Sequence, residues 1–170
     1  MEIGFGTNRG DSFMITRQNN GFEFIELISL KETKINQYHP LAGSYAIIEL
    51  RGKYLLCYNS MRRQWELPAG KREVGETPLE CAKRELYEET GQFVSDLQFI
   101  GLARIKNILN GAEKYNPIYY SMMDSLQPFQ QNHETSEIRL WDAKKAVHID
   151  QVDLAILKKL KTMILTKRGS

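Results

Sequence analysis

The sequence predicts an α+β domain in which a mixed β-sheet lies between helices, and three observations favour this class. Strand-like apolar segments stand on both sides of a helical segment at 78–90, and a second helical segment follows residue 150. Of the 170 residues, 42% are hydrophobic and 26% charged, close to the average of soluble domains. No repeat or linker divides the chain, so we expect residues 1–170 to form a single domain.

The N-terminal part of the chain is expected to begin with a β-hairpin. The apolar segments 13–17 and 22–29 are separated by a polar turn that ends in Asn20-Gly21, and this pair favours the positive φ angles of a tight turn. Residues 1–37 are therefore interpreted as a β-rich N-terminal extension. It is expected either to join the sheet or to serve as the arm of a homodimer, because symmetric dimers are common.

A second hairpin is expected near the middle of the chain. The apolar segments 44–50 and 54–59 flank Arg51-Gly52-Lys53, and their nearly continuous hydrophobicity is typical of buried strands. Residues 64–67 add a short strand that Pro68 ends. Further strands are expected around residues 93–106, 117–123 and 137–141.

Two helices are predicted from their periodicity and their end signals. Pro78 suits the first helical turn, Gly91 suits a left-handed position just past the last turn, and Leu79, Ala82 and Leu86 form the face that should dock on the sheet. Asp150 is expected to cap the second helix. The apolar stripe of that helix consists of Val152, Ile156, Leu157, Leu160, Met163 and Ile164.

Composition excludes several classes of function. With 23 Lys and Arg residues against 21 Asp and Glu residues, charge alone does not argue for nucleic-acid binding. Cys57 and Cys81 are too few for a disulfide scaffold, and each is expected to be a buried thiol. The apolar stretches are too short to cross a membrane, and the N-terminus lacks the pattern of a signal peptide, so we expect a cytoplasmic protein.

Three acids on the first predicted helix point to a divalent cation. Glu85, Glu88 and Glu89 lie at i, i+3 and i+4, which places them on one arc of the helix surface beside the apolar face. Such carboxylates repel one another, and Mg²⁺, with Mn²⁺ as a substitute, is the cation that best fits a set of oxygen ligands. The alternative is a solvated acidic face neutralised by Lys83 and Arg84.

A longer pattern surrounds these acids. Residues 70–91 read Gly-Lys-Arg-Glu-Val-Gly-Glu-Thr-Pro-Leu-Glu-Cys-Ala-Lys-Arg-Glu-Leu-Tyr-Glu-Glu-Thr-Gly. This segment resembles the Nudix box of the Nudix hydrolases, G-x5-E-x7-R-E-U-x-E-E-x-G-U, where U is apolar. One position departs from the pattern, because Gln92 stands where an apolar residue is usual, and we expect Phe93 to fill its pocket. The resemblance implies the α/β/α Nudix sandwich for most of the chain.

The resemblance also implies roles for individual residues. The metal would be held by Gly70, through its carbonyl, and by Glu85, Glu88 and Glu89, which would also be the catalytic residues. Glu76 and Arg84 would be supporting residues, although Glu76 could instead be an acid that only favours the helix start. The general base would be either one of the helix acids or an acid of a late loop, Glu134 or Glu137, with Glu134 the better placed of the two.

Several residues are candidates for substrate binding. The cations Arg62, Arg63, Lys71 and Arg72 bracket the box and could hold phosphate groups, or they could simply be solvated. Tyr119 is a candidate for stacking on a nucleobase, although core packing is the commoner role of a buried aromatic residue.

The expected function is therefore a Mg²⁺-dependent pyrophosphohydrolase with a small nucleotide substrate. The substrate would be a nucleoside diphosphate linked to another moiety, such as a nucleoside triphosphate or a nucleotide sugar, and an RNA 5′ end is the one nucleic-acid substrate left open. Residues 67–71, Leu-Pro-Ala-Gly-Lys, resemble the version in ADP-ribose pyrophosphatases, but Asn107 stands where those enzymes place a proline. The alternative is a non-catalytic Nudix-like sensor that binds a nucleotide.

Overall fold

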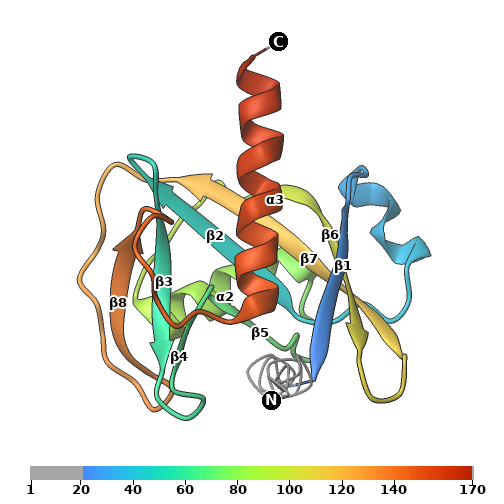
Figure 1. Ribbon diagram of the computed structural model, residues 1–170, viewed down its shortest axis with the longest axis horizontal. Coiled ribbons are helices and arrows are strands. Elements are labelled where there is room, and N and C mark those ends of the chain that lie inside the picture. The colour runs from blue at the N-terminus through green and yellow to red at the C-terminus, as the bar shows by residue number, and fades with distance from the viewer. Residues whose placement is uncertain (1–20, 170) are drawn as a thin grey trace, which may run out of the picture.

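The structure is a computed structural model that describes residues 21–169. The predicted strand 13–17 lies outside these residues, so the first hairpin stays a prediction. In chain order the elements are β1 (Phe22–Ile28), the short 3₁₀ helix η1 (Glu32–Gln37), β2 (Ser44–Leu50), β3 (Lys53–Asn59), β4 (Gln64–Glu66), β5 (Ala69–Gly70), α2 (Pro78–Thr90), β6 (Gln98–Asn107), β7 (Glu113–Met122), β8 (Thr135–Trp141) and α3 (Gln151–Arg168). Figure 1 shows their arrangement.

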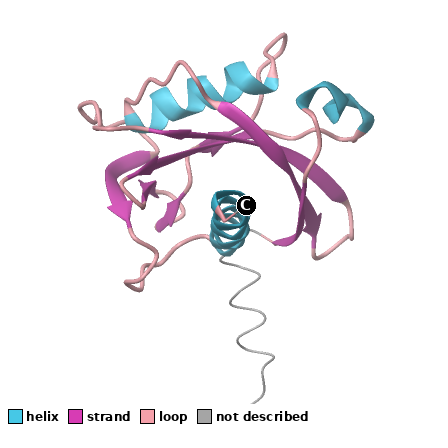
Figure 2. Cartoon of the chain, turned by 90° about the horizontal axis from the view of Figure 1, so that it is seen from above, coloured by secondary structure: helices cyan, strands magenta, loops and turns pink. Residues whose placement is uncertain are grey.

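The strands form one mixed sheet. Its order is β1-β6-β7-β2-β3-β4, with β5 paired to β2 and β8 paired to β3. The pairing of β2 with β7 is parallel, and the other ladders are antiparallel. In Figure 2 the sheet curves around α3, while α2 and η1 lie over its opposite face. The predicted α/β/α sandwich is confirmed.

Two hydrophobic clusters hold the three layers together. Because side chains alternate along a strand, β2 sends Ile47 to one face and Ala46 and Ile48 to the other, and all three are fully buried. The cluster with Ile47 packs against α3, and the cluster with Ala46 packs against α2. No helix within residues 21–169 combines the length and the apolar character needed to cross a bilayer.

Both predicted helices form as their end signals indicate. The Thr77 side chain accepts a hydrogen bond from the N–H of Glu80, and the Glu80 carboxylate accepts one from the N–H of Thr77. Gly91 ends α2 with φ 77°, a left-handed conformation that costs glycine little. At the start of α3, the Asp150 side chain accepts from the N–H of Asp153, which lies 3.0 Å away.

The described part of the extension over 1–37 joins the sheet, because β1 pairs with β6 as an edge strand, and the short helix η1 follows it. Two strand predictions require correction. Strand β6 begins at Gln98 instead of residue 93, since residues 91–97 form an irregular connection. Strand β7 begins at Glu113 instead of residue 117, because its pairing with β6 continues through polar residues.

Candidate active site

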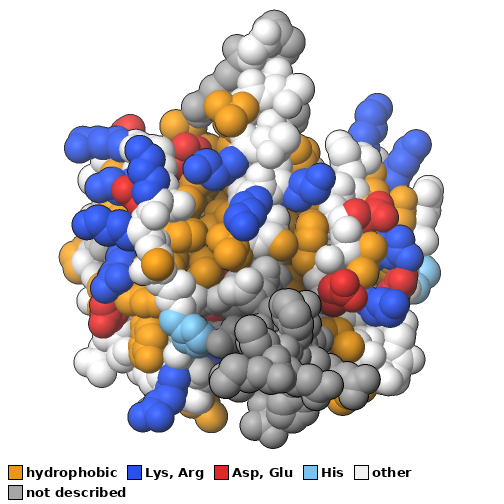
Figure 3. Space-filling model, in the orientation of Figure 1, with side chains coloured by type: hydrophobic (Ala, Val, Ile, Leu, Met, Phe, Trp, Pro, Cys, Tyr) orange, Lys and Arg blue, Asp and Glu red, His pale blue; other side chains and the backbone are white. Residues whose placement is uncertain are grey.

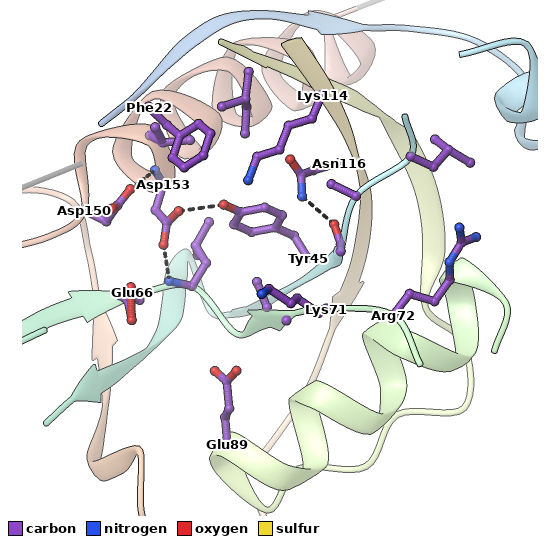
Figure 4. A pocket seen from close by; sticks show the side chains of 18 of the residues that line it. Phe22, Tyr45, Glu66, Lys71, Arg72, Glu89, Lys114, Asn116, Asp150 and Asp153 are labelled. Carbon is purple, nitrogen blue, oxygen red and sulfur yellow. Dashed lines mark hydrogen bonds between the residues drawn. The ribbon is translucent and has the colours of Figure 1, made fainter. Parts of the chain in front are cut away.

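A cavity of about 630 Å³ opens between the sheet, α2 and the start of α3. Figure 4 shows that Glu89 enters it from α2, Asp150 and Asp153 from the start of α3, and Lys114 and Asn116 from β7. A volume of this size is typical of pockets that bind small organic ligands. The lining residues of the cavity are Phe22, Leu41, Ala42, Gly43, Tyr45, Arg62, Glu66, Leu67, Ala69, Gly70, Lys71, Arg72, Glu89, Ile105, Lys114, Asn116, Asp150, Val152 and Asp153.

Two box acids and one box glycine meet beside this cavity. The carboxyl groups of Glu85 and Glu89 hydrogen bond to each other across one helical turn. The Glu85 carboxyl lies against Gly70, where an added Cβ would be only 2.1 Å from Glu85 Cδ. Burial, with the neighbouring charge of Glu85, raises the pKa of Glu89 to about 9, and burial also raises the pKa of Glu85. A nearby cation would relieve both penalties.

Arg84 is the centre of the ion-pair network on α2. Its guanidinium contacts Glu76 Oε2 at 2.6 Å, Glu85 Oε1 at 2.7 Å and Glu88 Oε2 at 3.0 Å. It also donates to the carbonyl of Lys71 at 2.9 Å, which ties the helix to the loop after β5. The hydrogen bond from Arg84 lowers the pKa of Glu76 to about 2. Glu76 therefore has a role beyond favouring the helix start.

Two buried thiols contact the same site. Cys57 Sγ on β3 lies 3.2 Å from Glu89 Oε2, and Cys81 Sγ on α2 lies 3.3 Å from the carbonyl oxygen of Gly70. A thiol can donate a weak hydrogen bond to each of these oxygen atoms. Both cysteines are free and buried, as the sequence predicted. Their contacts with Glu89 and Gly70, two candidate metal ligands, could not be predicted from the spacing of residues in the sequence.

The donor set suits a hard divalent cation, but the three box acids do not converge. Two carboxyl groups and one backbone carbonyl are oxygen donors of the kind that Mg²⁺ prefers. The Glu88 side chain is instead 55% exposed and paired with Arg84. Among the residues that the structure describes, no group of three His, Cys, Asp or Glu side chains could hold a metal ion as placed. Glu88 could join Glu85 and Glu89 only by leaving Arg84.

The predicted phosphate-binding cations divide into two groups. Arg62, Lys71 and Arg72 line the cavity, whereas Arg63 is exposed and is not among the lining residues. Arg62 also pairs with Glu66, at 3.0 Å between Nε and Oε2. Lys71 directly follows Gly70, so the chain itself places a cation next to the metal candidates.

Tyr119 does not line the cavity. Its ring is fully buried in the cluster between the sheet and α2, and its hydroxyl donates to Glu32 Oε1 at 2.7 Å. A ring without exposed surface cannot stack on a substrate, so Tyr119 is removed from the substrate-binding set. The alternative role, core packing, is the one that its burial supports.

Gln92 and Phe93 exchange the roles expected from the sequence. Phe93 is 62% exposed and does not fill the pocket after the box, while Gln92 is fully buried. The amide of Gln92 donates to the carbonyl of Gln127 at 2.8 Å and accepts from the N–H of Gln127 at 2.7 Å. A buried amide is tolerated because the backbone of a late loop satisfies it.

That late loop also carries Glu134, the candidate base. Asn132 donates to the carbonyl of Glu88 at 2.8 Å, and the Glu134 carbonyl accepts from the N–H of Ser60 at 2.8 Å. The loop is therefore held against the end of α2 where Glu88 and Glu89 lie. The Glu134 side chain is exposed and does not line the cavity.

Sequence reasoning missed an acidic group opposite the box helix. Asp153 is 4% exposed, accepts from the Tyr45 hydroxyl at 3.1 Å and accepts from the N–H of Leu67 at 2.8 Å. Burial and the neighbouring charge of Asp150 raise its pKa well above the ordinary value. The sequence offers one signal for it, a second aspartate three residues after the predicted helix cap Asp150.

Comparison with known proteins agrees with this geometry. Residues 37–161 match the model of the NUDIX domain family, which is well over half of the chain. The chain belongs to the Nudix family. A solved structure of the Bacillus subtilis pyrophosphohydrolase BsRppH is similar, with a TM-score of 0.62 and 24% identity over 81% of this chain and 90% of that chain. The likeness shows that this Nudix chain has the same fold.

Two further relatives are similar over different lengths. The NUDIX domain of Shewanella oneidensis NrtR, solved with ADP ribose, has a TM-score of 0.60 and 17% identity over 79% of this chain and 99% of that chain. The RNA pyrophosphohydrolase of Bartonella quintana is 51% identical over 39 residues, which are 23% of this Nudix chain and 22% of that protein. This match spans only about a fifth of the relative.

Proposed function

We propose that this Nudix chain is a Mg²⁺-dependent pyrophosphohydrolase that cleaves a phosphoanhydride bond in a nucleoside diphosphate linked to another moiety. The observation that carries the proposal is the contact of Glu85 with both Glu89 and Gly70, beside a cavity that contains Lys71 and Arg72. Carboxyl groups with raised pKa values suit the binding of a metal ion, and the neighbouring cations suit the binding of a phosphate chain.

Different residues of the chain would have different roles in such a reaction. Lys71, Arg72 and Arg62, which all line the cavity, would bind phosphate oxygens. Glu85, Glu89 and the Gly70 carbonyl would hold a divalent cation, which supplies charge neutralisation and a water of lowered pKa when bound. Arg84 would keep Glu85 in place, and its contacts with Glu76 and the Lys71 carbonyl would fix its own position.

The proton of the attacking water would go to a glutamate. Glu134 is the proposed base, because Asn132 ties its loop to the end of α2. A helix acid, Glu85 or Glu89, is the alternative. If Glu134 is the base, Glu134→Gln should lower kcat by about a hundredfold and remove the acidic limb of the pH profile of kcat. An unchanged profile would assign the role to the helix.

An RNA with a 5′-triphosphate is a second candidate substrate. The matched relatives include RNA pyrophosphohydrolases, and Figure 3 shows that Lys and Arg side chains gather over β3 and β8 and along α3. A triphosphate at an RNA 5′ end would present the same phosphoanhydride to the same residues. If RNA is the substrate, kcat/KM should fall steeply with salt, because binding would release counterions.

The test of the proposed function is a substrate screen with pure protein and Mg²⁺. The panel contains nucleoside triphosphates, nucleotide sugars, dinucleoside polyphosphates and a 5′-triphosphorylated RNA, and released phosphate, pyrophosphate or mononucleotide is measured. We expect hydrolysis of at least one class, loss of activity with chelator and recovery with Mg²⁺. Nucleotide binding without hydrolysis would favour the alternative of a sensor, and a rate that survives chelation would contradict the metal site.

We also propose that residues 1–170 form one cytoplasmic domain that assembles as a homodimer. The N-terminal arm suggested by the sequence must be tested without removing β1, because β1 is an edge strand of the sheet. Sedimentation of the full chain and of a chain that lacks residues 1–20 compares the two masses. We expect a dimer for the full chain and a monomer for the shortened chain if these residues form the arm.

A further inference from the structure

Asn116 on β7 carries an acceptor that the protein leaves without a partner. The residue is 6% exposed, and its Nδ2 donates to the carbonyl of Gly43 at 2.6 Å. Its Oδ1 is, among the described residues, the buried side-chain polar atom for which no hydrogen-bond partner exists. Because the Gly43 carbonyl can only accept, the amide cannot be turned to satisfy Oδ1 instead.

A buried acceptor of this kind is costly unless something pairs with it. The large majority of buried polar side-chain atoms in folded proteins have a partner, and an unpaired one is a penalty to the folded state. Asn116 lines the cavity that contains Glu89. In Figure 4 its nitrogen faces the Gly43 carbonyl, and its oxygen points away from that contact, to the side on which Lys114 lies. A ligand in the cavity can therefore supply the missing donor.

Lys114 provides a hydrogen-bond donor near this acceptor. It precedes Asn116 by two residues on β7, so the two side chains leave the same face of the sheet. Its ammonium group lies 4.0 Å from the centre of the Phe22 ring, and both residues line the cavity. Burial and the charge of Lys71 lower the pKa of Lys114. The far end of the cavity thus combines an acceptor, a donor and an aromatic ring.

This end of the cavity lies apart from the phosphate and metal candidates. Figure 4 places Asn116 and Lys114 on β7, across the cavity from Glu89 on α2. If the diphosphate lies near Glu89 and Lys71, the nucleoside extends toward β7. Nucleosides carry N–H groups on the base and O–H groups on the ribose, and both are donors that match a free amide oxygen.

We propose that Asn116 is a specificity-determining residue whose Oδ1 accepts a hydrogen bond from a donor of the substrate's nucleoside, either a base N–H or a ribose O–H. The inference rests on the proposed function for the identity of the ligand as a nucleotide. Selection by an unpaired buried acceptor is sharp, because an analogue without the donor leaves the acceptor without a partner.

The test uses 5′-monophosphates, which have no phosphoanhydride bond and so report binding without turnover. The probes are the four common ribonucleotides, their 2′-deoxy forms and purine riboside 5′-monophosphate, which lacks the amino group of adenine. Binding to the wild-type chain and to Asn116→Leu is measured by calorimetry. Asn110→Leu, which makes the same change at an exposed turn residue outside the cavity lining, is the control.

We expect Asn116→Leu to bind the preferred nucleotide about tenfold more weakly than the wild type does. For the analogue that lacks the critical donor, we expect the variant and the wild type to have equal affinities. Sensitivity to the 2′-deoxy change assigns the donor to the ribose, and sensitivity to a base change assigns it to the base. If the variant does not fold, the wild-type preference between each nucleotide and its donor-deficient analogue gives the same answer.

Three results would overturn the inference. These are equal weakening of all probes by Asn116→Leu, no wild-type preference between any nucleotide and its analogue, and no binding of mononucleotides at all. Selective binding by a chain that hydrolyses no pyrophosphate would overturn the proposed hydrolysis and leave the role of Asn116 intact, so the two failures are distinguishable.

Discussion

At the scale of single residues, the site contains a buried carboxyl group, that of Glu89, a half-buried one, that of Glu85, and the guanidinium of Arg84. Arg84 contacts Glu85 but not Glu89 within ion-pair distance, and Glu89 receives a thiol contact from Cys57 instead of a cation. The raised pKa of Glu89 is the consequence, because burial disfavours its charged form. A metal ion would supply the positive charge that the protein does not place there.

Glu89→Gln is expected to raise the stability of the metal-free protein at high pH and to lower its activity. A folded-state pKa of about 9 means that the carboxyl contributes stability below its unfolded-state pKa of about 4.3, and that this contribution is lost as the pH rises toward 9. Neutral Gln has no such dependence. At pH 8 without metal, the free energy of unfolding of Glu89→Gln should therefore exceed that of the wild type by about 1 kcal/mol or more.

The activity of the same variant should fall. Turnover with Mg²⁺ is expected to drop by about a hundredfold or more, because a ligand charge is lost. Denaturant unfolding at pH 5 and pH 8, together with an assay, measures both effects. Glu88→Gln is the matched comparison, and its turnover should fall only if the Glu88 carboxylate leaves Arg84 to join the metal ligands. Undiminished turnover in both variants would remove these acids from the site.

Gly70→Ala tests the close approach between β5 and α2. The added Cβ would lie 2.1 Å from Glu85 Cδ, so the Glu85 carboxyl would have to leave its position. We expect a loss of about 1–3 kcal/mol in the free energy of unfolding and a weakened affinity for Mn²⁺. In a Glu85→Ala background the same change should be nearly neutral, and an equal cost in both backgrounds would show that Glu85 is not what Gly70 accommodates.

At the scale of elements, the end of α2 and the late loop form one unit through Gln92. The Gln92 amide satisfies the N–H and carbonyl of Gln127, and Asn132 bonds to the carbonyl of Glu88. The buried side chain of Gln92 thus connects α2 to the loop that carries Glu134, the proposed base. The usual apolar residue could pack there but could not make these bonds.

Gln92→Leu should therefore loosen the loop more than the helix. Removing the amide takes away two hydrogen bonds to the backbone of Gln127, which should cost about 1–3 kcal/mol in the free energy of unfolding. Hydrogen exchange should become faster in residues 127–134, with α2 unchanged. Phe93→Leu is the control, since Phe93 is exposed. Equal protection in the wild type and Gln92→Leu would exclude this connection.

Much of the fold could be predicted because its signals are local. The bounds of α2 follow from Thr77, Pro78 and Gly91, and the β2–β3 hairpin follows from two buried segments around Arg51-Gly52. The start of β7 could not be predicted, because it depends on pairing with β6, including the ion pair between Arg104 and Glu113. Periodicity carries no information about such partners.

The candidate site shows the same division. The box motif identified Gly70, Glu85 and Glu89, and the structure brings these three together. The box motif could not identify Asp153 or Asn116, because each of these residues reaches the cavity from an element that is distant from the box in the sequence. Residue type alone made Tyr119 a candidate for stacking beside the alternative of core packing, and its burial depends on which face of β7 meets α2.

At the scale of the whole molecule, the cavity joins four groups with different chemistry. Glu89 of α2 lies on one side and the cations after β5 lie on a second, while Lys114 and Asn116 of β7 and the aspartates at the start of α3 lie on the others (Figure 4). Under the proposed function, this arrangement fits a substrate whose phosphates lie near the metal ligands and whose nucleoside extends toward β7. The sheet that curves around α3 is what brings these distant segments of the chain to one opening (Figure 2).

Anomalous diffraction from crystals soaked in Mn²⁺ tests the proposed metal site most directly. We predict a peak within ligand distance of the Gly70 carbonyl, Glu85 and Glu89, with the two carboxyl groups separated by the ion. Mn²⁺ that binds elsewhere, while Glu85 and Glu89 keep their mutual hydrogen bond at saturating metal, would contradict it.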